Sequence, residues 1–286
     1  MANPHRVAVL AFPGMAPFEL GVVVEVFGLP RPELARDPYE LTVFAEQPGP
    51  LAAVGGFSLT PRAGLEALRG AATVVIPGCP DKRAEPSAEL VSALRDAHAR
   101  GARMVSLCSG AFTLAAPGLL DGREAATHWR FAPLLAERFQ KVRVRPDVLY
   151  VDDGDVLSSA GSAAGIDLCL HLVRLDHGSE VANAVARGLV VAPHRDGGQA
   201  QFIDLPVAAR AGDQPLGHTM DWALERLAEP VSVGDLARHA HMSPRTFARR
   251  FNEAVGMSPG RWLVAQRVAA SLPLLEGSDD SVELVG

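Results

Sequence analysis

The strongest constraint on the fold is an alternation of short apolar strands with helical stretches over the first half of the chain. Four runs have the composition of buried strands: "RVAVLAF" (6–12), "ELTVFAE" (40–46), "AATVVIPG" (71–78) and "ARMVSLC" (102–108). The stretches between and after them, 17–29, 87–101 and 110–120, have helical periodicity. Because strands that alternate with helices form parallel sheets covered on both faces, the pattern predicts an α/β domain with a doubly wound, mostly parallel sheet.

The remainder of the chain extends this unit and then changes character. "ATHW" (126–129) begins another strand-to-helix unit, 149–161 is expected to be a hairpin turning at Asp153-Gly154, and 162–178 and 179–191 are expected to be long helices. Periodicity fades over 193–217, which is rich in Gly, Pro and polar residues. We therefore predict a domain at 1–192, a linker at 193–217 and a small all-α domain at 218–286.

Composition excludes several classes of protein. The three cysteines, Cys79, Cys108 and Cys169, form no C-x-x-C pair, so neither a disulfide framework nor a metal site is expected. Nucleotide-binding glycine fingerprints are absent, and no cofactor is expected. No apolar run approaches the roughly 20 residues that span a bilayer, and the N-terminus has no signal-peptide pattern, so we expect a cytoplasmic protein without membrane contact.

A basic segment stands out in this acidic chain, whose net charge is −6. Between Arg238 and Arg267 there are six arginines and one acid, Glu253, which gives a local charge of +5. Such a segment is either an ordinary solvated surface or a nucleic-acid-binding surface.

The helix signals inside this segment favour the second interpretation. Ser232 is placed to cap one helix, with Asp235 three positions on, and Ser243 is placed to cap a second helix across a short turn at His241-Met242. Two short helices across a tight turn form a helix-turn-helix. In the second helix, Phe247 and Phe251 are one turn apart and are expected to face the core.

The opposite face of that second helix has side chains suited to reading double-stranded DNA. They are Arg245, Thr246, Arg249, Arg250 and Asn252. Arginine can bind guanine edges or phosphates through two parallel hydrogen bonds, and asparagine can read adenine. We therefore predict that these residues contact an operator.

"DLARHAHMSPRTFARRF" resembles the first helix-turn-helix of AraC/XylS-type transcriptional regulators, and "GMSPGRWLVAQRVAASLPLLE" resembles the helix that follows it. Members of that family have two such units, which read successive segments of the major groove. Here the chain ends at "DDSVELVG", where the second unit should begin, so that unit is expected to be missing. Pro273 interrupts the expected connecting helix, at a cost of about 3 kcal/mol or a kink.

The first domain has a candidate reactive site at "SLCSGAFTLA" (106–115). Cys108 is expected at the end of a strand where a helix begins, a position that suits a nucleophile. The backbone N–H groups of Ser109 and Gly78 are candidates for an oxyanion hole, and Cys79 is expected to line the same crevice. The alternative for Cys108 is a buried structural cysteine.

Two polar residues are expected at the same edge of the sheet, because the carboxyl ends of parallel strands converge there. Glu19 begins the helix after the first strand, and His128 follows a later strand. Each has an ordinary alternative: an acid favoured by the helix dipole and a solvent-facing histidine.

"FELGVVVEVFG", "SLCSGAFTLAAPGLLDGREAATHW" and "SAGSAAGIDLCLHLV" resemble the ThiJ/PfpI branch of the class I glutamine amidotransferase-like superfamily, from about Val7 to Val191. The resemblance implies a flavodoxin-like sheet in which Cys108 is the elbow nucleophile, Glu19 its hydrogen-bonding acid and His128 a candidate base. Glutamine hydrolysis is not expected, because no histidine is followed by the His-x-Glu spacing. Fusion to an AraC-type unit resembles the GlxA family of regulators, which implies that the first domain senses a small molecule or mediates oligomerisation without turnover.

Three functions therefore remain open. The favoured one is a DNA-binding transcriptional regulator that responds to an unknown small-molecule effector and forms a homodimer. The second is a cysteine-dependent hydrolase or hydratase, whose turnover would require Cys108. The third is a redox switch at Cys108.

Overall fold

The structure is a computed structural model that describes residues 5–32, 34, 37–198, 214–255 and 257–277. The chain divides into two units, residues 1–201 and 202–286, and the boundary falls inside the predicted linker 193–217. Residues 278–286, where the second helix-turn-helix unit was expected to be missing, lie outside the described residues.

Within the described part of the first unit, one six-stranded sheet has the order β2 (Tyr39–Phe44), β1 (His5–Leu10), β5 (Thr73–Ile76), β6 (Arg103–Leu107), β10 (Val156–Ser159) and β9 (Tyr150–Asp153). The first five strands are parallel, and β9 runs antiparallel to β10. The hairpin between β9 and β10 turns at Gly154, whose φ angle is 80°. The predicted doubly wound, mostly parallel sheet is confirmed.

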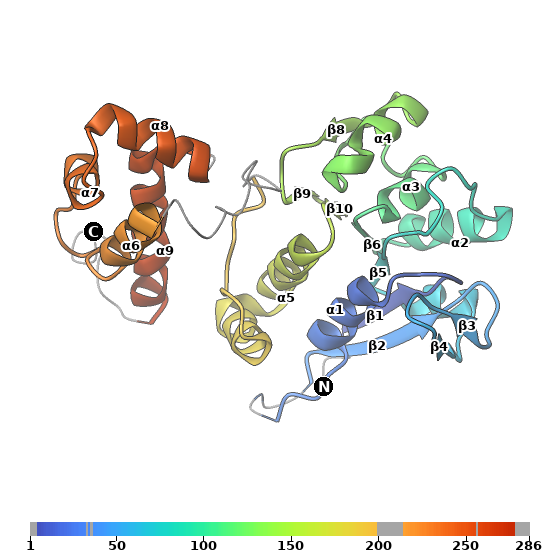
Figure 1. Ribbon diagram of the computed structural model, residues 1–286. Helices are drawn as coiled ribbons and strands as arrows, with labels where there is room; N and C mark the ends of the chain where they lie inside the picture. The colour runs from blue at the N-terminus through green and yellow to red at the C-terminus, as the bar shows by residue number, and fades with distance from the viewer. Residues whose placement is uncertain (1–4, 33, 35–36, 199–213, 256, 278–286) are drawn as a thin grey trace. The chain divides into compact units, whose positions relative to one another are not determined.

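Alternate residues of each strand face the two sides of this sheet. In β1, Val7 and Val9 pack with α1 (Pro17–Phe27) and α5 (Ala163–Leu189) on one side. Ala8 and Leu10 pack with α2 (Ala88–Ala99) and α3 (Gly110–Ala115) on the other side (Figure 1). Both faces are thus covered by helices, as expected for buried parallel strands.

Smaller elements lie in the connections between the strands and helices of this unit. They are a hairpin of β3 (Leu51–Ala52) and β4 (Ser58–Leu59), a parallel pair of β7 (Glu124–Ala126) and β8 (Arg143–Arg145), α4 (Ala132–Arg138), and 3-10 helices at Leu65–Gly70 and Trp129–Phe131. β7, the second 3-10 helix and α4 form the strand-to-helix unit expected from "ATHW".

Two helices differ from their predicted extents. The helix predicted at 110–120 ends at Ala115, because Pro117 has no N–H to donate and Gly118 adopts a positive φ of 79°. The two helices predicted at 162–178 and 179–191 form one element, α5, with a break at Gly178, where φ is 83° and ψ is 174°.

The described part of the second unit consists of the helices α6 (Gln214–Leu224), α7 (Val233–His239), α8 (Pro244–Val255) and α9 (Pro259–Gly277). Its core includes Phe247 and Phe251, both fully buried, and Trp262, whose ring meets that of Phe251 edge-on at 5.5 Å between centroids. α9 continues through Pro273. α6 begins at Gln214, inside the predicted linker, so the last four residues of that segment are helical.

Candidate functional site

A strained turn places Cys108 between β6 and α3. Its φ angle of 54° lies in the left-handed region, which is unfavourable for a residue with a side chain. Gly161 packs directly against it, since a Cβ on Gly161 would lie 2.2 Å from the Cβ of Cys108. The elbow expected from "SLCSG" is therefore formed, and glycine is required beside it.

Glu19 ties the surrounding loops together at this elbow. It lies in the first turn of α1 with 9% of its surface exposed. Its Oε2 accepts a hydrogen bond from the N–H of Gly78 at 2.7 Å, and its Oε1 accepts one from the N–H of Ser162 at 3.1 Å. The carboxylate thus connects the loop after β5 with the N-terminus of α5. We call Cys108, Glu19, Gly78, Gly161 and Ser162 together the Cys108 crevice.

The predicted oxyanion hole does not form in this arrangement. The N–H of Gly78 was predicted to be one of its donors, but this group donates to Glu19. An oxyanion hole requires donors that are free to meet a developing negative charge. The Ser109 N–H remains as the second predicted donor, and it stabilises the thiolate form of Cys108 instead.

The environment of Cys108 disfavours its ionised form. Burial, reinforced by the negative charge of Glu19, raises the pKa of the Cys108 thiol to about 12, and the opposing effects of the Ser109 N–H and Lys82 are smaller. With its pKa raised in this way, Cys108 is a neutral thiol near pH 7, and the nucleophilic thiolate form is rare.

His128 lies beside the crevice, but the hydrogen bond that its ring accepts comes from the Arg130 backbone and not from Cys108. It caps the 3-10 helix Trp129–Phe131, and its Nδ1 accepts a hydrogen bond from the N–H of Arg130 at 3.2 Å. Burial and the positive charge of Arg130 lower the pKa of His128, and Glu19 partly opposes them. A neutral imidazole in this tautomer has its proton on Nε2. The geometry does not pair His128 with Cys108 as a base.

Cys79 and Ser109 brace the start of α3. The Ser109 hydroxyl donates to the carbonyl of Cys79 at 3.0 Å, and the Cys79 thiol donates to the carbonyl of Ser109 at 3.3 Å. Burial raises the pKa of the Cys79 thiol. These side chains therefore hold the loop after β5 against the elbow.

Gly161, Ser162 and Thr127 belong to the site but were not predicted from the sequence. The Thr127 hydroxyl donates to the carbonyl of Cys108 at 2.8 Å and so joins the loop before His128 to the elbow. The sequence signal for the first two residues was "SAGSAAG", where a strand ends in Gly-Ser before a helix. A glycine there indicates a close backbone approach, although the partner is not readable from sequence.

The second unit contains the predicted helix-turn-helix. The Ser232 side chain accepts from the Asp235 N–H, and the Asp235 carboxylate accepts from the Ser232 N–H, which completes a capping box on α7. His241 takes a positive φ of 53° in the turn between α7 and α8. Phe247 and Phe251 then anchor α8, with their rings 5.4 Å apart.

The predicted DNA-reading face of α8 is presented to solvent. Arg245, Arg249, Arg250 and Asn252 are exposed on it. Thr246 is half-buried, and its hydroxyl is engaged with the Ser243 hydroxyl at 2.9 Å in the helix cap. The prediction that Thr246 reads DNA is therefore weakened, because its hydroxyl already has a partner.

Three arginines of the basic segment have partners within the protein, and one of them is Arg249, which pairs with Glu253 at 2.8 Å. Arg238 pairs with Asp235 of the capping box. Arg267 of α9 donates to the carbonyls of Leu227, Glu229 and Val231 at 3.0, 2.8 and 3.0 Å. Fewer guanidinium groups of this segment are therefore available to contact DNA than the sequence suggests.

Other kinds of site are not apparent in the described part of the chain. No group of three or more His, Cys, Asp or Glu side chains suited to a metal ion occurs there. None of the helices described is long and apolar enough to cross a membrane. A groove of about 510 Å³ lies between α2 and the 3-10 helix Leu65–Gly70, away from the elbow.

Comparison with known proteins assigns the first unit. Residues 5–175 match the model of the DJ-1/PfpI family. The chain belongs to the DJ-1/PfpI family. Residues 236–286 match a helix-turn-helix domain, a segment that contains α8 and the second half of α7.

Several proteins that this chain resembles are named as transcriptional regulators. The chain is 29% identical over 288 residues to the HTH-type transcriptional regulator ArgR of Pseudomonas aeruginosa, covering 100% of this chain and 85% of the relative. It is 32% identical over 163 residues to the HTH-type transcriptional regulator GlxA of Rhizobium meliloti, covering 54% of this chain and 48% of the relative. An AraC family transcriptional regulator from Pseudomonas putida superposes with a TM-score of 0.58 at 26% identity, covering 65% of this chain and 100% of that structure. The resemblances predicted from sequence are confirmed.

Proposed function

We propose that this chain is a cytoplasmic, sequence-specific DNA-binding transcriptional regulator whose Cys108 crevice binds a small-molecule effector without turnover. One observation supports it above the others: a DJ-1/PfpI unit and a helix-turn-helix lie in one chain that aligns along its whole length with a transcriptional regulator. A DNA-reading helix has no role in a simple hydrolase, whereas a crevice in a regulator can bind a ligand that shifts DNA affinity.

The geometry of the crevice supports binding rather than catalysis. Nucleophilic catalysis needs a thiolate and free donors for the oxyanion. Cys108 has a pKa raised to about 12, and the Gly78 N–H is already bonded to Glu19. A hydrolase or hydratase would have to rearrange both groups before each reaction.

The exposed face of α8 supports DNA reading. Arg245, Arg249 and Asn252 follow one another at intervals of about one turn on a helix that two buried phenylalanines hold in place. Arg249 pairs with Glu253 at 2.8 and 3.0 Å, and both side chains are exposed, so a DNA group can replace this pair. We infer that α8 enters the major groove, where such side chains distinguish base pairs.

We further infer a homodimer on DNA. One helix-turn-helix reads a short segment, and a two-fold pair can occupy two half-sites about one helical turn apart. The selected binding site should therefore be a palindrome or an inverted repeat.

Selection of duplexes from a random library by the full-length chain tests the proposal. The affinity for the selected duplex is then measured by fluorescence anisotropy for Arg245→Ala, Arg249→Ala and Asn252→Ala. Each change is expected to cost about 1–3 kcal/mol, at one base position if the side chain reads a base and uniformly if it binds phosphate.

Arg145→Ala is the matched control, because it removes the same charge from a strand of the first unit. It should bind like the wild type. The DNA-reading proposal fails if the chain enriches no duplex, or if all three α8 variants bind as tightly as this control.

A further inference from the structure

The segment 193–198, where the chain leaves the sheet unit, is bound to α5. We call it the strap. The guanidinium of Arg195 donates to both carboxylate oxygens of Asp167, from Nε at 2.9 Å and from Nη2 at 2.7 Å. The Asp167 side chain is 8% exposed. A two-bonded pair with a buried carboxylate fixes orientation as well as distance.

The strap is also bound to the start of β9. The carbonyl of Gly197 accepts hydrogen bonds from the N–H groups of Leu149 and Tyr150 at 2.7 and 3.2 Å. A Cβ on Gly197 would lie 2.7 Å from the carbonyl oxygen of Tyr150, so the approach requires glycine. The Tyr150 hydroxyl donates to the carbonyl of Arg195 at 3.3 Å.

The same helix that holds the strap begins in the Cys108 crevice. Ser162 is the N-cap of α5, and its N–H donates to Glu19 at 3.1 Å. Gly161, one residue earlier, packs against the Cβ of Cys108. Asp167 follows in the second turn of α5, so few residues separate the crevice from the strap.

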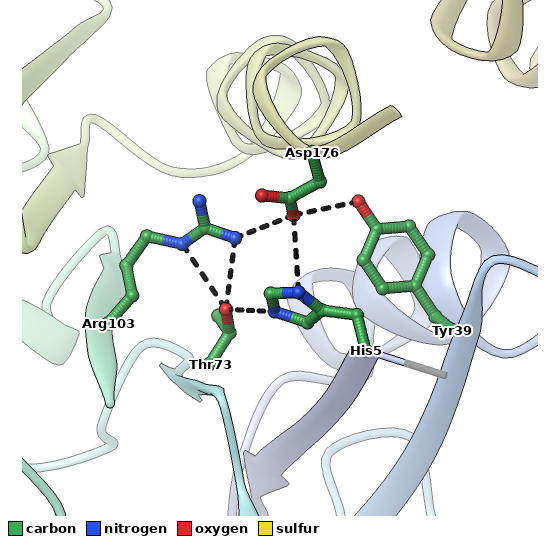
Figure 2. Close-up of polar contacts among 5 residues, drawn as sticks. All are labelled: His5, Tyr39, Thr73, Arg103 and Asp176. Atoms are coloured by element: carbon green, nitrogen blue, oxygen red, sulfur yellow. Dashed lines mark hydrogen bonds and ion pairs between the residues drawn. The ribbon is translucent and has the colours of Figure 1, made fainter. Parts of the chain in front are cut away.

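The part of α5 before its break, residues 163–177, is called the half-helix. Its far end is fixed at the amino-terminal ends of the strands, opposite the Cys108 crevice. Figure 2 shows Asp176 among the first residues of four neighbouring strands: His5, Tyr39, Thr73 and Arg103. Asp176 Oδ2 accepts from the Tyr39 hydroxyl at 2.9 Å and from Arg103 at 2.6 Å. Arg103 and His5 both contact the Thr73 hydroxyl, and His5 Nδ1 lies 4.0 Å from Asp176. This end of the half-helix is therefore tied to four strands.

The half-helix 163–177 is a rod of about 22 Å, at about 1.5 Å per residue, with the Cys108 crevice at its first residue and the Asp176 contacts at its last turn. Gly178 breaks the helix beyond Asp176, so the rod ends there. A group that pushes on Gly161 from the crevice would tilt the rod about the Asp176 end and displace Asp167 with it.

We propose that this half-helix transmits occupancy of the Cys108 crevice to the strap, and through the Arg195–Asp167 pair to the segment that leads to the DNA-binding unit. The inference rests on the proposed function, because it supplies the route by which an effector changes DNA affinity. It makes Asp167 and Arg195 coupling residues that touch neither effector nor DNA.

The test is a double-mutant cycle on the full-length chain with its selected duplex. Cys108→Met serves as the probe, because a larger side chain in the crevice presses on Gly161. Its effect on the DNA dissociation constant is compared in the wild-type and Arg195→Ala backgrounds. We expect a change of about fivefold or more in the first background and none in the second.

Hydrogen exchange at the Leu149 and Tyr150 amides gives a second readout, because these amides donate to Gly197. Cys108→Met should accelerate their exchange, and Arg195→Ala should accelerate it further. Arg145→Ala, which removes an arginine of similar exposure paired with Glu124, is the matched control background and should leave the coupling intact. Asp167→Asn repeats the test with little change in volume if Arg195→Ala unfolds.

The outcomes separate the two proposals. Equal effects of Cys108→Met on DNA affinity in both backgrounds would overturn the strap as the route, while leaving the regulator intact. If Cys108→Met accelerates exchange at the strap but leaves DNA affinity unchanged, transmission stops before the DNA-binding unit, and the inference is overturned. No change in either readout, in protein that binds its duplex, would overturn this inference together with the effector role of the crevice.

Discussion

The reactivity expected of Cys108 is the property that best separates a sensor from an enzyme. With a pKa of about 12, the thiolate fraction at pH 7.5 is about 1 in 30,000. A free cysteine with a pKa of about 8.5 is about one-tenth ionised at the same pH, a difference of about 3,000-fold. A more basic thiolate is intrinsically more nucleophilic, and this raises the reaction rate of the Cys108 thiolate about 30-fold relative to that of a free cysteine thiolate. Cys108 should therefore react about a hundredfold more slowly than a free cysteine.

Alkylation by iodoacetamide, followed by mass spectrometry of the intact chain, measures this rate. A Cys79→Ser background removes the other partly exposed thiol, and Cys169 is fully buried. The rate should rise about tenfold per pH step of one from pH 7 to 10 without a plateau. Glu19→Gln should raise the rate at pH 7.5, because it removes the negative charge beside the thiol.

A different pH profile would refute this reasoning. If Cys108 reacts at pH 7.5 as fast as free cysteine and its rate levels off below pH 9, the thiolate is stabilised in the crevice. The interpretation as a nucleophile or a redox switch would then be preferred to that of a neutral sensor pocket. Circular dichroism of each variant at the highest pH used excludes unfolding as the source of reactivity.

Three further predictions follow from the packing and charges described above. Phe251→Ala should lower the free energy of unfolding of the helical unit by about 3–5 kcal/mol, read from urea denaturation; a loss below about 1 kcal/mol would contradict the burial of this ring. Glu253→Gln should tighten binding to the selected duplex, because it removes a negative charge near the phosphates and releases Arg249; weaker binding in the anisotropy assay would instead show that Glu253 positions Arg249. Gly161→Ala should lower the thermal midpoint, since its Cβ would meet that of Cys108 at 2.2 Å, and an unchanged midpoint in calorimetry would mean that the elbow relaxes at little cost.

The fold was predictable because it depends on local patterns. Apolar runs of strand length alternate with helical periodicity, and this alternation is sufficient to specify a parallel sheet covered on both faces. The capping box at Ser232 and Asp235 was equally readable, because all its groups lie within four residues. The end of the helix at Ala115 was misplaced, since the periodicity continues past Pro117 while the backbone does not.

The site was only partly predictable, because its hydrogen bonds join residues far apart in the chain. Glu19 and Cys108 were placed correctly at one edge of the sheet by the topology of parallel strands. The hydrogen bond from the Gly78 N–H to Glu19 depends on side-chain geometry, and no local sequence pattern encodes it. The contact between the Ser243 and Thr246 hydroxyls could have been anticipated, because the side chain of an N-cap serine accepts from the backbone N–H three residues on and so lies beside that residue.

The three carbonyls that accept hydrogen bonds from Arg267 affect how mutagenesis of this unit should be interpreted. An alanine scan that scored affinity alone would count Arg267 among the residues that grip phosphate. Removal of Arg267 would break three hydrogen bonds to the segment before α7, so a smaller fraction of the protein would be folded correctly for DNA binding. The slope of log affinity against log salt distinguishes the two cases, because only a true phosphate contact changes the number of counterions released.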